Sequence, residues 1–195
     1  MKVNVLLFDD FDTLEAAAPL EVFGKLPEHF HVSYYSFSGS FVTSLQKIKI
    51  WTDFLDENLN GDILIIPGGK GARRLIWGDE KVCRLIKQIV DHHSFCVMIG
   101  SGTAMLAQIG LLYRRHICDF PMDQNWNQMF TAGITRTDNA FWVADGKFYS
   151  ASSATAGLDM CLNILADLVD LDIAQKTAAE IGYDWDPDRL DGIYR

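Results

Sequence analysis

The sequence lacks any long uninterrupted hydrophobic run. Its first apolar stretch covers Val3–Phe8 and ends at Asp9 and Asp10. A secretory signal peptide needs a longer apolar region and a small-residue cleavage site, and a membrane helix needs about 20 apolar residues. We therefore expect a soluble protein without a membrane segment.

Paired cysteines and clustered basic residues are also missing. Cys83, Cys96, Cys118 and Cys161 show no CxxC or CxxH spacing, so we expect neither a zinc site nor a disulfide framework, but a reduced, cytoplasmic protein. Lysine and arginine total 17 against 26 aspartates and glutamates, a net charge of −9. This balance argues against a nucleic-acid or anionic-membrane partner, because phosphate binding requires clustered basic residues. No motif indicates a metal or another cofactor.

The sequence does contain strand-like and helix-like runs in alternation, and 49% of its residues are hydrophobic. Strands are predicted at Val3–Phe8, Val32–Phe37, Ile48–Trp51, Asp62–Ile66 and Phe95–Ile99, and helices at Pro19–Lys25, Lys81–His92 and Thr103–Gly110. Such alternation predicts an α/β fold with a mainly parallel sheet and helices on both faces.

The second half of the chain predicts a small β-hairpin addition and two closing helices. Short strands are expected at Ile134–Thr137, Phe141–Ala144 and Phe148–Ala151, the last two joined by the turn Asp145-Gly146, and helices at about Ala154–Leu168 and Ala174–Ile181. No repeat or linker interrupts the pattern, so we expect one domain over residues 1–195. The segment from Asp184 to Arg195 carries no assignable pattern.

One turn has the pattern of a catalytic elbow. Ile99-Gly100-Ser101-Gly102 links a predicted strand to a predicted helix, an arrangement that places its central residue above the sheet and aims helix amides at the same point. A glycine-rich turn made for tight packing would show the same residues, so both interpretations stay open here.

Several segments together resemble the ThiJ/PfpI superfamily, which has the flavodoxin-like fold of class I glutamine amidotransferases, and within it the isonitrile-hydratase-like branch. The similarity runs from Val3 to about Tyr183. Its main segments are Leu14–Phe23, Ile65–Gly69, Gly100–Gly102 with Gly110–Leu112, Arg114-Arg115 and Ala156–Asp159.

The resemblance also exposes departures from the family pattern. Counting back from Gly110 places the family's nucleophilic cysteine at Gly100, which has no side chain with which to attack a substrate. Ser101 matches the family's threonine, with its hydroxyl expected to point away from the thiolate position. The histidine that the family often carries after Arg-Arg is Asp119 here. Several site positions are therefore changed together.

Other parts of the family site are retained. Glu15 matches the family's catalytic acid, and the backbone amides of Gly69 and Ser101 match its oxyanion donors. A carboxyl sheltered from water could have a raised pKa and act as general acid or base. We expect Pro19 to be the first residue of its helix, and Glu21 to be a structural first-turn charge.

Other notable side chains have structural interpretations. We expect Cys96 and Cys118 to be buried free thiols rather than substitute nucleophiles. His92 and His93 should end a helix as imidazolium groups, and Phe120, Trp126 and Trp142 should be core or dimer contacts.

Two functions follow from this reasoning. The first is a pseudoenzyme or small-molecule binding protein related to isonitrile hydratase. The alternative is a hydratase or hydrolase in which Glu15 activates water without covalent catalysis. Covalent cysteine chemistry is disfavoured by the missing thiol, and transcription regulation by the charge and the lack of a DNA-binding segment. The resemblance implies a homodimer. If the chain is a simple pseudoenzyme, Gly100→Cys should be accepted by the elbow and give a reactive thiol.

Overall fold

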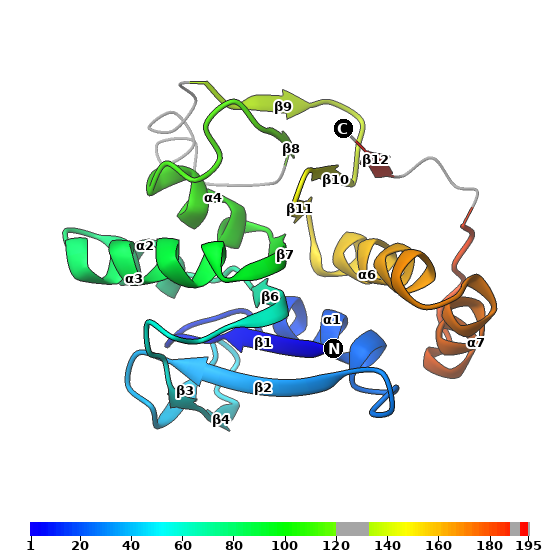
Figure 1. Cartoon of the computed structure of the whole chain (residues 1–195), viewed down its shortest axis with the longest axis horizontal. Coiled ribbons are helices and arrows are strands. Elements are labelled where there is room, and N and C mark those ends of the chain that lie inside the picture. Colours follow the sequence, from blue (N-terminus) through cyan, green and yellow to red (C-terminus); the bar gives the residue numbers. More distant parts are fainter. Residues whose placement is uncertain (120–132, 188–191, 195) are drawn as a thin grey trace.

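Eight strands form the central sheet of the computed structural model, which describes residues 1–119, 133–187 and 192–194 (Figure 1). These strands are β1 Lys2–Leu6, β2 His31–Ser36, β5 Asp53–Phe54, β6 Gly61–Ile66, β7 His93–Ile99, β10 Trp142–Asp145, β11 Phe148–Ala151 and β12 Gly192–Tyr194. Their order is β12-β10-β11-β7-β6-β1-β2-β5, with β10 and β11 antiparallel and the other neighbours parallel. The predicted α/β fold with a mainly parallel sheet is confirmed.

The middle of the sheet is built from the most apolar runs of the sequence. In β6, Ile63, Leu64, Ile65 and Ile66 are all at most 1% exposed, so both faces of the strand are covered. Helix-covered parallel strands require such continuous apolar sequences. This is why β1, β6 and β7 could be predicted from the sequence.

Helices cover both faces of this sheet (Figure 1). They are α1 Thr13–Phe23, α2 Gly71–Ile76, α3 Glu80–Asp91, α4 Ser101–Gln108, α6 Ala154–Leu168 and α7 Leu171–Ile181. Helices α1, α6 and α7 contact one another, while α2 contacts both α3 and α4. The two groups lie on opposite sides of the central strands.

Helix α1 begins earlier than predicted, and the predictions for Pro19 and Glu21 are wrong. Asp12 is the N-cap, because its carboxylate accepts from the amides of Leu14 and Glu15. Pro19 consequently lies inside the helix, where its missing N–H leaves the Glu15 carbonyl without the usual helical hydrogen bond. Glu21 lies in the second half of the helix, exposed and 3.7 Å from Lys25 Nζ.

His93 is also placed differently from the prediction. It begins β7 rather than ending a helix, and it is only 3% exposed. Its Nδ1 lies 2.6 Å from the Ile89 carbonyl oxygen and its Nε2 lies 2.9 Å from Asn4 Nδ2. Because burial lowers its pKa, His93 is a neutral core residue and not an imidazolium at a helix end.

Two smaller sheets flank the main one. The hairpin of β3 Phe41–Thr43 and β4 Lys49–Trp51 follows β2, and the parallel pair of β8 His116–Cys118 and β9 Thr135–Thr137 follows α4. Strands β10 and β11 form the predicted hairpin, but its turn is Gly146-Lys147, one residue later than predicted, because Asp145 is still paired in β10. The hairpin belongs to the main sheet. The unassigned C-terminal segment contributes β12, which pairs with β10.

Two further sequence expectations can be compared with the described residues. None of the helices in the described ranges is long and apolar enough to cross a membrane. Trp142 is a core residue at 3% exposure, and its ring contacts that of Tyr194. Phe120 and Trp126 lie outside the described residues.

Candidate functional site

Three neighbouring strands bring the predicted site residues to one edge of the sheet. Strands β7, β6 and β1 are adjacent and parallel, so the segments that follow them meet beyond their carboxyl ends. In open parallel sheets this edge is where ligands bind. The segments contribute Gly100 after β7, Gly68 and Gly69 after β6, and Glu15 after β1.

Gly100 forms a sharp turn between β7 and α4. Its φ of +51° and ψ of −125° lie in a region that glycine adopts without a steric penalty and other residues rarely occupy. The turn is fixed at both sides, because the Gly100 amide donates to the Ala151 carbonyl at 2.9 Å and its own carbonyl accepts from Thr103 at 3.1 Å. The strand-turn-helix arrangement predicted from the sequence is therefore present, with the geometry of an elbow and a glycine at its centre.

The carboxyl group of Glu15 occupies the space beside this turn. Its Oε2 accepts a hydrogen bond of 2.7 Å from the Gly68 amide. A Cβ atom on Gly100 would lie 2.6 Å from Glu15 Oε1, and one on Gly68 would lie 2.5 Å from Oε2. We call the space between Gly68 and Gly100 the glycine slot. A side chain at either position would have to displace the carboxyl group that fills it.

The position of Glu15 depends on an altered helix start. Asp12 and Glu15 have the spacing of a capping box, in which the second residue normally turns back to the amide of the first. Here the Asp12 amide donates instead to the Gly68 carbonyl at 2.8 Å. Because Gly68 takes over this role, the Glu15 carboxyl is directed to the Gly68 amide and into the slot.

This environment makes Glu15 a weak acid. Burial raises the pKa of Glu15 to about 7; the hydrogen bond from Gly68 opposes the rise, and the nearby charge of Asp12 adds to it. At neutral pH, both the protonated and the ionised form of the Glu15 carboxyl group are therefore populated. This is the range in which a group can serve as both general acid and general base.

Ser101 is engaged with the adjacent glycine. Its Oγ accepts from the Gly69 amide at 2.9 Å and lies 3.3 Å from the Gly69 carbonyl oxygen, to which it can donate. The Gly69 amide, predicted as an oxyanion donor, therefore already has an acceptor. A ligand oxygen could use it only by replacing the Ser101 hydroxyl.

Asp119 is not joined to these residues. It directly follows β8, its side chain is 60% exposed, and its carboxylate accepts from Arg136 Nη1 at 3.0 Å. Within the described ranges it makes no hydrogen bond or ion pair with Glu15, Gly100 or Ser101.

The thiols near the site are poorly suited to nucleophilic attack. Cys96 and Cys118 are fully buried. Burial raises the pKa of both thiols to about 12. The thiolate is the reactive form of cysteine, and almost none of it is present at neutral pH under these conditions.

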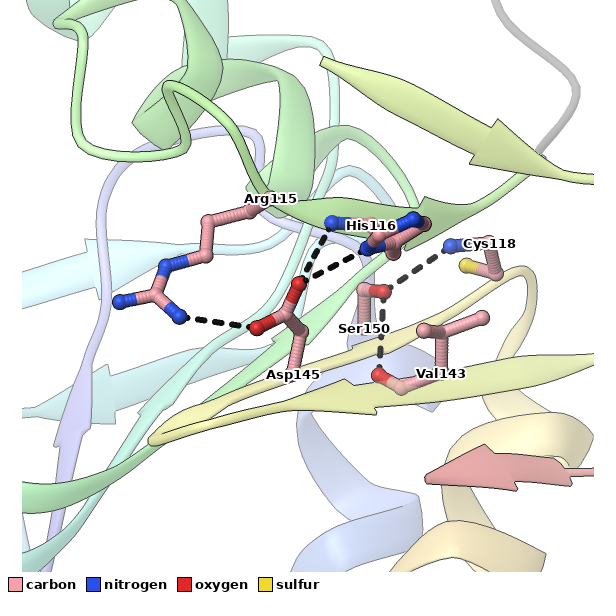
Figure 2. Close-up of polar contacts among 6 residues, drawn as sticks. All are labelled: Arg115, His116, Cys118, Val143, Asp145 and Ser150. Atoms are coloured by element: carbon pink, nitrogen blue, oxygen red, sulfur yellow. Dashed lines mark hydrogen bonds and ion pairs between the residues drawn. The ribbon is translucent and has the colours of Figure 1, made fainter. Parts of the chain in front are cut away.

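A second carboxyl group, which sequence reasoning treated only as a turn residue, has a well-defined network (Figure 2). Asp145 accepts from Arg115 Nη1 at 2.8 Å and from the His116 amide at 2.8 Å, and its Oδ2 lies 3.1 Å from His116 Nδ1. Burial alone would raise the pKa of Asp145, but the hydrogen bonds from His116 and Arg115 hold it below its ordinary value. Ser150 lies beside this network, where its hydroxyl accepts from the Cys118 amide and donates to the Val143 carbonyl.

These contacts attach β8 to the β10–β11 hairpin. The carboxylate of Asp145 is surrounded by three donor groups, one from Arg115 and two from His116. Figure 2 shows the Arg115 and His116 side chains pointing toward it. Asp145 therefore acts as a fixed structural charge.

The fold and the elbow define an α/β protein of the flavodoxin-like class, with its candidate site at the carboxyl ends of β1, β6 and β7. The model of the DJ-1/PfpI family matches residues 1–167, and the chain belongs to this family. The predicted superfamily is thereby confirmed.

Its relatives are distant in sequence. Isonitrile hydratase from Pseudomonas putida is 24% identical over 187 residues, which cover 94% of this chain and 78% of that protein. The structure is similar to a THiJ/PfpI family protein from Pseudomonas syringae, with a TM-score of 0.82, 22% identity and coverage of 96% and 77%. It is also similar to a mutant DJ-1 superfamily protein from Salmonella typhimurium, with a TM-score of 0.81, 25% identity and coverage of 94% and 99%.

Proposed function

We propose that this chain is a member of the DJ-1/PfpI family that works without a cysteine nucleophile and binds a small molecule at the carboxyl group of Glu15. The observation that carries the proposal is the glycine slot. Residue 100 offers no side chain, and the Glu15 carboxyl fills the space that a side chain there would need. The burial of Cys96 and Cys118 supports the same conclusion, because no nearby thiol is placed to substitute.

The same carboxyl group suggests the kind of ligand. A protonated carboxyl donates one hydrogen bond and accepts others, so it suits a small, uncharged molecule that carries a basic lone pair. The similarity to isonitrile hydratase makes isonitriles the first class to test. Their terminal carbon bears such a lone pair.

The pKa of Glu15, raised to about 7, favours a second candidate, a noncovalent hydratase. The acid form of Glu15 would protonate the terminal carbon of an isonitrile. Water would then add to that carbon while the resulting Glu15 carboxylate accepts a proton from the water. The adduct would tautomerise to an N-substituted formamide, so that one water is consumed, no group leaves and the acid is regenerated.

The test uses cyclohexyl isocyanide with the full chain at pH 7, with formamide followed by proton NMR. Glu15→Gln should lower hydratase activity by roughly 10²–10⁴-fold, the usual contribution of a general acid or base. Glu21→Gln is the matched control, because Glu21 lies on the same helix but is exposed and pairs with Lys25. It should leave the rate unchanged.

Binding is measured separately, from the carboxyl carbon signal of Glu15 as the isonitrile is added. A saturable change without formamide identifies a binding protein, and turnover that depends on Glu15 identifies the hydratase. Turnover that survives Glu15→Gln but is abolished by iodoacetamide would contradict the proposal. If neither binding nor turnover occurs, isonitriles are not the ligand class.

We also propose a homodimer in a reducing, cytoplasmic compartment. The β3–β4 hairpin supports the dimer. Its Phe41 and Trp51 are 60% and 58% exposed, and the centroids of their rings are 5.1 Å apart. A second copy of the chain would cover these aromatics. All four cysteines are free, as a reducing compartment requires. Trp51→Lys should convert the dimer to a monomer in light scattering, whereas a wild-type monomer would contradict this assignment.

A further inference from the structure

The loop between β3 and β4 reaches the first turn of the helix that carries Glu15. Gln46 lies in this loop and is exposed. Its Oε1 accepts from the Thr13 amide at 2.9 Å and from the Thr13 hydroxyl at 2.7 Å. Its Nε2 donates to Asp12 Oδ2 at 3.0 Å. One surface side chain therefore makes three hydrogen bonds to the start of α1.

These bonds complete the N-terminus of α1. The first amides of a helix have no partner within the helix and must find one elsewhere. Asp12 Oδ1 accepts hydrogen bonds from the backbone amides of Leu14 and Glu15. The Thr13 amide is left over, and Gln46 is its acceptor. Asp12 and Gln46, which are more than thirty positions apart in the sequence, therefore cap α1 together.

The loop that carries Gln46 is itself held in place. The Ser44 amide donates to the Ile48 carbonyl at 2.8 Å, and the Ile48 amide donates to Ser44 Oγ at 3.0 Å. The Leu45 amide donates to the Phe11 carbonyl at 2.8 Å, directly before the cap. Gln46 is therefore presented to α1 by a hydrogen-bonded turn fixed against the β1–α1 segment.

We propose that Gln46 is a positioning residue for Glu15. It fixes the Asp12 carboxylate through Oδ2, while Oδ1 of the same carboxylate holds the Glu15 amide. The Asp12 amide in turn holds the Gly68 carbonyl, at one wall of the glycine slot. Gln46 thereby keeps the Glu15 carboxyl seated between Gly68 and Gly100. The importance of this role rests on the proposed function of Glu15, but its test does not require a ligand.

The test replaces Gln46 with methionine, which has a similar length and no hydrogen-bonding amide. Two quantities are measured on the full chain: hydrogen exchange at the Thr13 amide and the NMR titration of the Glu15 carboxyl carbon. We expect exchange at Thr13 to accelerate about tenfold, because its amide loses its acceptor. We also expect the pKa of Glu15 to fall toward the ordinary glutamate value of about 4.3, because a loosened first turn admits water to the slot. Lys49→Met, an exposed change on β4, should alter neither quantity.

The two readouts separate positioning from simple capping. Faster exchange at Thr13 with an unchanged Glu15 titration would overturn the proposal, because Gln46 would then stabilise the helix end alone. If Gln46→Met does not fold, Thr13→Val removes only the hydroxyl contact with Gln46 and should shift the Glu15 titration in the same direction by less. An unchanged titration in that variant would also overturn it. Failure of the isonitrile experiments leaves these outcomes unaffected, so the two proposals can fail separately.

Discussion

Glu15 lies in the first turn of α1 and Asp145 is the last residue of β10. Both carboxyl groups are largely shielded from solvent, yet their pKa values shift in opposite directions. Glu15 accepts a hydrogen bond from one neutral amide and lies near the negative charge of Asp12. Asp145 accepts from an arginine, a backbone amide and a histidine ring. Burial raises the pKa of Glu15 to about 7, whereas the donors around Asp145 outweigh burial and lower its pKa.

The difference shows that burial alone does not determine what a carboxyl group can do. A buried carboxyl with a cation remains ionised and holds structure together, while one without a cation keeps a proton that it can donate. The two groups also affect stability in opposite ways. Asp145 stabilises the folded state above the ordinary aspartate pKa, and this stabilisation is lost as the pH falls through its lowered folded pKa. The raised pKa of Glu15 lowers the stability of the folded state as the pH rises from the ordinary glutamate pKa to about 7, and the loss is constant above that.

The largest effect is expected from removing the paired carboxylate. Asp145→Ala should lower the free energy of unfolding by about 2–4 kcal/mol at pH 7, because three donors lose a charged acceptor. Urea unfolding measures this loss. The control is Asp119→Ala, which breaks one ion pair of a 60% exposed carboxylate and should cost less than about 1 kcal/mol. Equal losses in the two variants would show that the Asp145 network contributes little.

Removing the unpaired carboxyl should stabilise the protein, depending on pH. Glu15→Gln should raise the free energy of unfolding by about 2–3 kcal/mol at pH 8.5, because glutamine avoids burial of the negative charge. The folded pKa of about 7 lies above the unfolded value of about 4.3. The gain should therefore be absent below pH 4, grow as the pH rises toward 7 and remain constant above it. A gain that does not change with pH would contradict the assignment.

A methyl group in the slot tests why Glu15 keeps its proton. Gly100→Ala combines about 1–3 kcal/mol of backbone strain, at a φ of +51° and a ψ of −125°, with a Cβ atom that would lie 2.6 Å from Glu15 Oε1. Gly110→Ala is the control, because Gly110 also has a positive φ but a Cβ there would meet nothing within 4 Å. The Gly100 variant should lose more stability than the Gly110 variant, and it alone should lower the pKa of Glu15 by displacing its carboxyl. An unchanged Glu15 titration would mean that the slot does not hold the group.

The smallest effect is expected at the thiols. Iodoacetamide at pH 7 should modify the partly exposed Cys83 first and slowly, and leave Cys96 and Cys118 unmodified in the folded protein. Peptide mass spectrometry at increasing times measures the order. Rapid stoichiometric labelling of Cys96 or Cys118 would mean that a thiol, and not the carboxyl group, is the reactive group near the slot.

The fold was largely predictable because its central strands are continuous apolar runs. An apolar run that ends in glycine, as at β6 and β7, is typical of a buried parallel strand followed by a turn. The predicted range of α6 also agrees with the structure. The short edge strands could not be predicted, because β5 has two residues and β12 three, and their pairing depends on neighbours distant in sequence. The Asp12–Glu15 spacing marks the start of α1, whereas Pro19, which is also typical of a first helical position, lies inside the helix.

The candidate site was only partly accessible from sequence. Glu15, Gly100, Ser101 and Gly69 were selected by resemblance, and the structure brings them together. Asp119 was selected in the same way but pairs with Arg136 instead. Gln46 and Asp145 had no sequence signal, because their roles come from partners about thirty residues away. The expectation that Gly100→Cys would fit the elbow readily did not include the Glu15 carboxyl, which already fills that space.

The seating of Glu15 in the glycine slot would couple proton uptake to the binding of any ligand that requires the acid form. Because the pKa of Glu15 is raised to about 7, both its protonated and its ionised form are populated near neutral pH. A ligand that requires the acid form must therefore draw protons from the buffer when it binds. Its apparent affinity should fall about tenfold for each pH unit above the pKa. Calorimetric heats should differ between phosphate and Tris in proportion to the buffers' ionisation enthalpies. The number of protons taken up on binding would thus show, without any label, whether the ligand binds to the protonated form of Glu15.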